Sequence, residues 1–181
     1  MIHEILLAGA GGQGILFLGR ILAEAALMEN KEVSWFPAYG PEQRGGTSHC
    51  SVVISQHMIG NPMVSEPDIL VAMNYASRQR FLGAVKGSGI VITNDVVGNN
   101  EGDDRPGKPM EIVVPANEIG EELGQPRVAN IVMLGTLLAN RPVVKRSTVE
   151  QILSHVLRSG REEMLTMNRK ALERGYAYRS P

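Results

Sequence analysis

At 181 residues, 43% of them hydrophobic and 20% charged, the chain has the length and composition of a globular protein, and we expect a single domain over residues 1–181. Its formal charge of -1, from 18 basic and 19 acidic side chains, argues against nucleic-acid or membrane binding. The one cysteine, Cys50, excludes an intramolecular disulfide and a self-contained iron–sulfur cluster, and it fits a cytoplasmic protein.

The first segment predicts a strand, a glycine turn and a helix. An apolar run over residues 5–8 ends at the glycines, and apolar residues recur at helical spacing from Ile15 to Ala26. The turn, Gly9-Ala10-Gly11-Gly12-Gln13-Gly14, matches G-x-G-x-x-G, whose backbone N–H groups can approach an anion at a helix start. A turn that serves only close strand–helix packing explains the same residues, so both hypotheses stay open here.

A second strand is predicted over residues 32–36, and it weakens the case for a nicotinamide cofactor. Such a cofactor is usually held by an acidic residue at the carboxyl end of this strand. Here Pro37 and Ala38 follow the strand, and Glu32 lies at its opposite end. A stand-alone nucleotide-binding Rossmann-like protein therefore remains only as an alternative of a different class.

Residues 49–55 predict a third strand. The connection from the second strand is too short for a parallel crossover, so we expect an antiparallel third strand and a mixed sheet. His49 and Cys50 are neighbours in this strand and should point to opposite faces, which argues against a metal site. We expect no metal-binding residues and no catalytic residues in this chain.

The connection itself, "AYGPEQRGGTSH", has two stiff turns around charged side chains. Gly40-Pro41 and Gly45-Gly46 predict the turns, and they place Glu42 and Arg44 between them. The Arg44 guanidinium suits a phosphate or a carboxylate. The alternative is a solvated loop with an Arg–Glu surface pair.

The rest of the chain predicts alternating strands and helices, followed by a helical part. Strands are expected over 68–73, 89–94 and 110–115, a helix over about 75–85, and a mobile polar loop over 95–109. Later helices are expected over 117–124, 129–141, 147–160, with a Ser147–Glu150 capping box, and 162–174, ended by Gly175. Asn74 and Asn130 fall where ligands bind in α/β sheets, although a role at a helix start explains each equally well.

Five segments, taken in order, resemble the gamma subunit of the 2-oxoacid:ferredoxin oxidoreductases. They are "LLAGAGGQGI", "FPAYGPEQRGGTSHCSVVIS", "PDILVAMN", "ANIVMLGTLLA" and "NRKALERGY". The resemblance covers nearly the whole chain, and the "YGPEQRGGT" form is similar to the 2-oxoglutarate and branched-chain 2-oxoacid types. It implies an α/β fold: a three-layer Rossmann-like domain with a mixed, mostly parallel sheet, like domain III of pyruvate:ferredoxin oxidoreductase.

The resemblance also implies that the chain is one component of an enzyme. That enzyme converts a 2-oxoacid and coenzyme A to acyl-CoA, CO2 and reduced ferredoxin, with thiamine diphosphate, Mg and iron–sulfur clusters carried by other subunits. Expected partners are thiamine-binding alpha and beta subunits, a ferredoxin-like delta subunit and ferredoxin as acceptor, and the isolated chain is expected to form a homodimer. The small subunit of indolepyruvate:ferredoxin oxidoreductase is an alternative within the same class, and an assembly subunit that contacts no ligand is another possibility. Candidate binding residues are Gly9, Gly11, Gly12, Gln13, Gly14, Tyr39, Gly40, Pro41, Glu42, Arg44, Gly45, Gly46, Thr47, Asn74 and Asn130.

Arg44→Lys tests the function of the connecting loop. If Arg44 holds a coenzyme A phosphate or a carboxylate across a subunit interface, lysine keeps the charge but loses the bidentate contact. We expect coenzyme A use or subunit association in the assembled enzyme to weaken by about 1–3 kcal/mol, with the fold almost unaffected. Steady-state kinetics and size-exclusion chromatography measure this, and wild-type values in both would show that the loop is only a turn.

Overall fold

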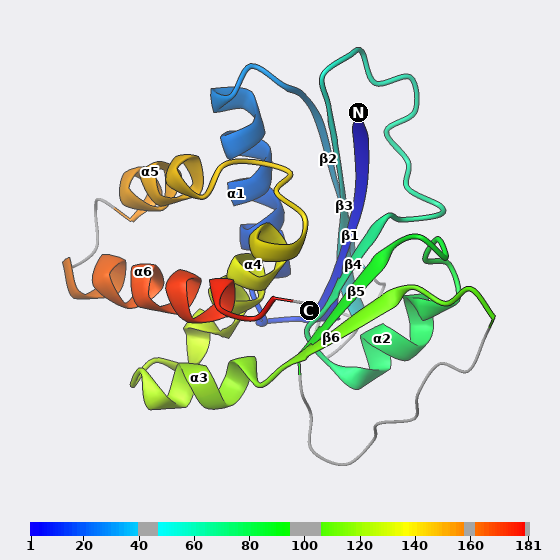
Figure 1. Cartoon of the computed structure of the whole chain (residues 1–181). Coiled ribbons are helices and arrows are strands. Elements are labelled where there is room, and N and C mark those ends of the chain that lie inside the picture. The colour runs from blue at the N-terminus through cyan, green and yellow to red at the C-terminus, as the bar shows by residue number, and fades with distance from the viewer. Residues whose placement is uncertain (40–46, 95–105, 158–161, 180–181) are drawn as a thin grey trace.

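The computed structural model describes residues 1–39, 47–94, 106–157 and 162–179, without the side chains of residues 39 and 47. These residues form a six-stranded sheet in the order β2-β3-β1-β4-β5-β6 (Figure 1). In chain order the strands are β1 (Ile2–Ala10), β2 (Glu32–Tyr39), β3 (Thr47–Ser55), β4 (Ile69–Ala72), β5 (Ile90–Asn94) and β6 (Met110–Val114).

The sheet is mixed, as predicted. β3 lies between β2 and β1 and runs antiparallel to both, whereas β1, β4, β5 and β6 pair in parallel. β2 extends past its predicted end and includes Pro37. An edge strand tolerates proline because one side of its backbone needs no partner.

Helices cover the two faces of the sheet unequally. One face carries α1 (Ile15–Met28), α3 (Ala116–Glu122), α4 (Ala129–Asn140), α5 (Arg146–Val156) and α6 (Glu162–Tyr176), and a short 3-10 turn, Pro126–Val128, precedes α4. The other face carries α2 (Tyr75–Leu82) (Figure 1). The result is the three-layer α/β arrangement that was expected. Within the described residues, no helix is long and apolar enough to cross a membrane.

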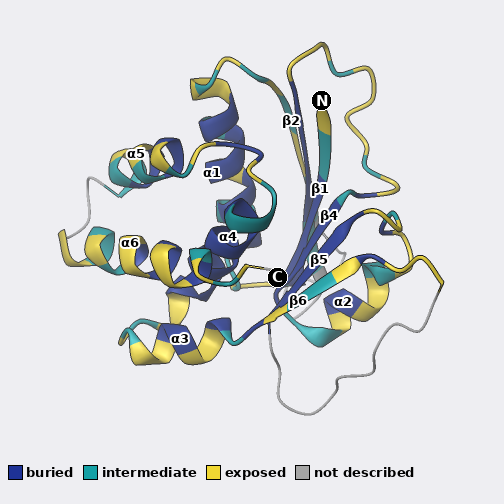
Figure 2. Cartoon of the chain, viewed as in Figure 1, coloured by how far each residue is buried: buried dark blue, intermediate teal, exposed yellow. Residues whose placement is uncertain are grey.

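The alternation of side chains along β1 divides the apolar core into two clusters. Ile5 and Leu7 pack with the larger helical layer, while Leu6 and Ala8 pack with the α2 side. All four side chains are buried, which explains why the strand reads as a continuous apolar run (Figure 2). A double-sided core of this kind fixes the register of the central strands.

An ion pair between a buried arginine and a partly buried glutamate ties α2 to the far edge of the sheet. Arg78 donates to both carboxylate oxygens of Glu111 on β6, at 2.5 and 2.7 Å, and the Arg78 side chain is only 6% exposed. The Thr93 hydroxyl donates to the same carboxylate at 3.0 Å. Because a buried charge needs such partners, this cluster fixes how α2 lies on the sheet.

Two predicted helix ends are wrong. The capping box is absent because α5 begins one residue earlier, at Arg146, whose Nε donates to Glu150 at 2.8 Å. Gly175 does not end the last helix, since α6 continues to Tyr176. Gly124, by contrast, closes α3 with a positive φ of 73°, as predicted. The predicted helix end at Gly160 and the polar loop over 95–105 lie outside the described residues.

Gly175 is required by helix packing. A Cβ built at Gly175 would overlap the carbonyl of Val132, and one at Gly135 would overlap the carbonyl of Leu172. The two glycines thus let α4 and α6 approach backbone to backbone. The Thr136 hydroxyl donates across this contact to the Gly175 carbonyl at 3.0 Å.

Gly175→Ala should therefore destabilise the protein. The added methyl has to push α6 away from α4, and overpacking of this kind costs about 1–3 kcal/mol or more. Gly60→Ala is the matched control, since a Cβ at Gly60 meets no described atom within 4 Å. Urea denaturation should show a loss for Gly175→Ala and a change of less than about 1 kcal/mol for Gly60→Ala. Equal stabilities would contradict the packing role.

Candidate functional site

The carboxyl ends of β1 and β2 lie at the same edge of the sheet. Ala10 pairs with Thr47, and Tyr39 pairs with Ser48, so β1 and β2 end where β3 begins. The glycine turn and the connecting loop therefore leave from one edge. Six candidate residues of that loop lie outside the described residues: Gly40, Pro41, Glu42, Arg44, Gly45 and Gly46.

The glycines of the turn after β1 differ in what surrounds them. A Cβ at Gly9 would come within 2.9 Å of Gln13 Oε1, and one at Gly14 would overlap the Asn130 amide. A Cβ at Gly11 or at Gly12 meets no described atom within 4 Å. Gly9 and Gly14 are thus needed for packing, whereas the backbone at Gly11 and Gly12 is open to approach.

Gly12 and Gly14 also have a conformational requirement. Their φ values are 91° and 75°, in the left-handed region that favours glycine. Gly11 does not belong to the residues with positive φ. Neither its own conformation nor the described packing explains a glycine at position 11.

Gln13 holds this turn together from within. Its Oε1 accepts from the Ala10 backbone N–H at 2.7 Å and from the Asn74 side-chain amide at 2.8 Å. Its Nε2 donates to the Met73 carbonyl at 3.2 Å. One carboxamide therefore joins the end of β1 to the end of β4, and the turn is fixed without a ligand.

The Met73 carbonyl is the meeting point of this amide network. It accepts from Gln13 and also from Asn94 Nδ2, at 3.3 Å. Asn94 Oδ1 in turn accepts from the Ala116 backbone N–H at 3.0 Å. The network thus spans the ends of β1, β4 and β5 and the start of α3.

The two other candidate asparagines also bond within the chain. Asn74 caps α2 by accepting from the Ser77 backbone N–H at 2.8 Å, which is the capping role weighed from the sequence. Asn130, the second residue of α4, donates to the Gly14 carbonyl at 3.3 Å. Both side chains position the backbone around the glycine turn.

Sequence reasoning missed Asn94, although a signal existed. Asn94 ends the buried strand "IVITN", the position that drew attention to Asn74 after the neighbouring strand. Its amide is completely buried, so both of its polar atoms need partners. A polar residue at the carboxyl end of each buried strand is therefore a usable sign of such a network.

His49 and Cys50 point to opposite faces, as predicted. The Cys50 thiol lies 3.6 Å from the Ile15 carbonyl on the α1 side, and burial raises its pKa to about 11. The His49 ring lies 5.1 Å from the ring of Phe81 on the α2 side. Burial, followed by the nearby Arg80 charge, lowers the pKa of His49. Both groups are therefore uncharged at neutral pH.

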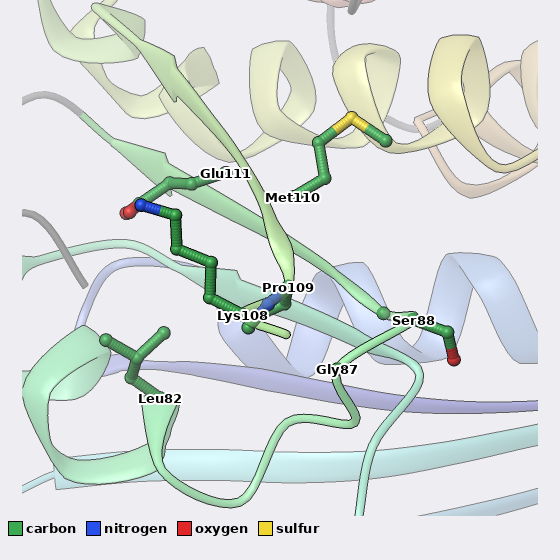
Figure 3. A pocket seen from close by; sticks show the side chains of 8 residues that line it. Leu82, Gly87, Ser88, Lys108, Pro109, Met110 and Glu111 are labelled. Atoms are coloured by element: carbon green, nitrogen blue, oxygen red, sulfur yellow. The ribbon is translucent and has the colours of Figure 1, made fainter. Parts of the chain in front are cut away.

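A separate cavity lies at the opposite edge of the sheet, where β5 and β6 begin. It has a volume of about 540 Å³ and lies beside the end of α2 (Figure 3). None of its lining residues was a candidate from the sequence. The lining consists of Leu82, Gly87, Ser88, Gly89, Lys108, Pro109, Met110 and Glu111.

The sequence matches the family described as pyruvate ferredoxin/flavodoxin oxidoreductase over residues 4–178. It is 40% identical over 173 residues to the ketoisovalerate oxidoreductase subunit VorA of Methanothermobacter thermautotrophicus, a match that covers 95% of this chain and 35% of VorA. It is 37% identical over 183 residues to the 2-oxoglutarate synthase subunit KorC of Methanocaldococcus jannaschii, covering 97% and 93% of the two chains. The chain thus spans about a third of VorA and nearly all of KorC.

Solved structures show the same fold. The gamma subunit of keto/oxoacid ferredoxin oxidoreductase from Geobacter sulfurreducens is 30% identical, with a TM-score of 0.82 over 98% of this chain and 96% of that chain. The 2-oxoglutarate:ferredoxin oxidoreductase from Magnetococcus marinus, with 2-oxoglutarate, coenzyme A and succinyl-CoA bound, is 25% identical, with a TM-score of 0.88 over 98% of this chain and 31% of that one.

The amide network predicts opposite effects for two buried polar residues. Ser77 is completely buried, and its hydroxyl has no hydrogen-bond partner among the described residues. Ser77 lies in the first turn of α2, where the residue four positions earlier, Met73, precedes the N-cap and its carbonyl accepts from Gln13 and Asn94 instead. Ser77→Ala should leave stability unchanged or raise it by up to about 1 kcal/mol.

Asn94→Ala is the matched comparison, since it leaves the buried Ala116 N–H without a partner and should cost about 1–3 kcal/mol. Chemical denaturation of both variants measures the difference. A larger loss for Ser77→Ala than for Asn94→Ala would contradict the network as described.

Proposed function

Because the chain belongs to the pyruvate ferredoxin/flavodoxin oxidoreductase family, we propose that it is the gamma subunit of a multi-subunit 2-oxoacid:ferredoxin oxidoreductase. Its enzyme would oxidise a 2-oxoacid with coenzyme A to acyl-CoA and CO2 and pass the electrons to ferredoxin. The observation that carries this proposal is the match over nearly the full length of both chains to KorC and to the Geobacter gamma subunit. Both of those proteins are subunits, and their chains are nearly as long as this one.

The names of the relatives favour particular substrates. VorA is named for ketoisovalerate, and KorC for 2-oxoglutarate. These names support the 2-oxoglutarate or branched-chain hypothesis over the indolepyruvate alternative. Thiamine diphosphate, Mg and the iron–sulfur clusters are proposed to belong to the alpha, beta and delta subunits of the complex.

The glycine turn is the proposed contribution of this chain to the assembled site. The amide network fixes the turn before any ligand arrives, so little conformational entropy is lost on binding. The Gly11 and Gly12 backbone is open on the same edge from which the connecting loop leaves. We propose that this edge faces coenzyme A or the thiamine-binding subunits, consistent with the coenzyme A bound in the Magnetococcus relative.

Reconstitution tests the proposed function. The chain is mixed with the alpha, beta and delta subunits encoded in the same genome, and reduction of ferredoxin is followed with 2-oxoglutarate, ketoisovalerate or indolepyruvate and coenzyme A. We expect turnover with one of the first two substrates, and none from the chain alone. Full activity without this chain, or activity with indolepyruvate only, would contradict the proposal.

Gly11→Ala tests, in the same reconstituted enzyme, whether a ligand or partner approaches the backbone at position 11. The methyl group meets nothing in the described structure, so thermal stability should stay within about 1 kcal/mol of the wild type. If a ligand or partner approaches the backbone there, the methyl should reduce kcat/KM for coenzyme A by about tenfold or more. Gly9→Ala is the control, because its Cβ would crowd Gln13 and Ile15 and should lower stability instead. Wild-type kinetics for Gly11→Ala would exclude a close approach at this position.

A further inference from the structure

Another cavity lies at the amino end of β1, the end opposite to the glycine turn (Figure 1). It has a volume of about 290 Å³ and forms where the start of β1, the end of β3, the turn between α1 and β2 and the connection between α4 and α5 meet. None of its lining residues belongs to the site proposed above. The lining includes His3, Lys31, Ile54, Gln56, Pro142 and Val143.

His3 faces the larger helical layer. It lies directly opposite Ile54 of β3, and Ile54 packs in the core cluster of that layer. Directly opposed residues of two paired strands point to the same face of a sheet. Val143, from the connection between α4 and α5, belongs to the same cluster. The half-buried imidazole therefore points into the space between the sheet and this connection.

Two side chains of the cavity keep unused hydrogen-bonding capacity. The Lys31 ammonium donates to Glu29 Oε2 at 2.8 Å and to the Val143 carbonyl at 2.7 Å, so its position is fixed. An ammonium carries three donors, and the third has no acceptor among the described residues. The ring nitrogens of His3 have no hydrogen-bond partner in the described part of the chain either. The exposed carboxamide of Gln56 adds further donors at the same cavity.

Positive charge predominates around the cavity. Glu29 offsets the charge of Lys31, with which it forms an ion pair. Asp68 is likewise offset, because it pairs with Lys86. Arg141 forms no ion pair with any carboxylate of the described residues. The charge left over at this end of the sheet thus favours an anion.

The charges that act on His3 have the same balance. They are the negative charge of Asp68 and the positive charges of Lys31, Arg141 and the amino group of Met1. Burial, together with these positive charges, lowers the pKa of His3 even though Asp68 acts in the opposite direction. The imidazole is therefore uncharged at neutral pH while the cavity holds no anion.

The apolar part of the lining narrows the class of anion. Three of the lining residues, Ile54, Pro142 and Val143, supply apolar walls beside the donors. Inorganic phosphate has no apolar part to place against such walls, whereas a carboxylate on a short branched aliphatic chain has both parts. We propose that this cavity binds a small aliphatic carboxylate, with Lys31 and His3 donating to its oxygens. The inference does not depend on the proposed function, because the glycine turn contributes nothing to this cavity.

Ligand titration followed by NMR tests the carboxylate site. The probe is isovalerate, added to the full chain while the imidazole signals of His3 are followed. We expect saturable shifts with a Kd of about 5 mM or lower, and binding of inorganic phosphate that is at least about fivefold weaker. Absence of saturation up to about 50 mM isovalerate, or equal affinity for phosphate, would overturn the inference.

Gln56→Glu gives a variant whose fold is expected to be intact. The change keeps the size of an exposed side chain and places a negative charge at the cavity, so the affinity for isovalerate should fall by about fivefold or more. Asn61→Asp is the matched control, since it makes the same amide-to-carboxylate change at an exposed residue outside the lining. Its affinity should stay within about twofold of the wild type. Wild-type affinity of Gln56→Glu, or an equal loss for Asn61→Asp, would contradict the site, and thermal melting checks that both variants are folded.

Binding at this cavity should also depend on pH. A bound carboxylate favours the protonated form of His3, so the pKa of His3 rises on binding and isovalerate binds more tightly as the pH falls. Between about pH 8 and about pH 6 the affinity should increase by about threefold, because isovalerate itself stays ionised there. His3→Gln should remove this dependence. A wild-type affinity that does not change with pH would exclude the contact between His3 and the carboxylate.

Discussion

The antiparallel insertion of β3 between β2 and β1 is the constraint on which the architecture depends. Residues 40–46 are too few for a crossover, so the chain has to turn back and pair beside β2. This return brings the carboxyl ends of β1 and β2 to one edge and places the connecting loop beside the glycine turn. It also moves β2 outward, beyond the width that α2 covers. The place of the proposed site at this edge is thus a consequence of one short connection.

At that edge, a single carbonyl organises the polar groups. The two acceptor positions of Met73 are filled by Gln13 and Asn94, which arrive from different segments. Buried amides at strand ends would cost stability if they were unpaired, and here both amides donate to the same backbone carbonyl. The arrangement fixes the glycine turn, and the buried Ser77 hydroxyl has no partner among the described residues. Rigidity of the turn is thus a property of the chain, present before any ligand binds.

Much of this fold could be predicted from the sequence, because burial on both faces of the sheet imposes apolar runs on strands and helical periodicity on the covering helices. Helix ends were less predictable. The capping signal at Ser147 lost to a start one residue earlier, where Arg146 pairs with Glu150, and the stop signal at Gly175 is overridden by a tertiary contact. Gly175 leaves room for the Val132 carbonyl of α4, a helix distant in sequence, and no local sequence pattern reveals that contact. In the site, the sequence identified the glycine turn and Asn74. The role of Gln13 was hidden because it depends on a backbone carbonyl that residue identity does not show.

The glycines of the turn look alike in the sequence, but the structure shows that they are needed for different reasons. Gly9 and Gly14 are explained by neighbouring side chains, and Gly12 by its φ, but neither reason applies to Gly11. Among the described residues, the half-exposed Phe36 likewise has no packing explanation, and His49 Nδ1 has no hydrogen-bond partner. All three lie on the β1–β3 half of the sheet, whereas the half with β4, β5 and β6 is tied to α2 by the Arg78–Glu111 pair. The glycine turn proposed as the contribution of this chain lies on the same half, so the β1–β3 half is the side from which we propose that the rest of the enzyme approaches.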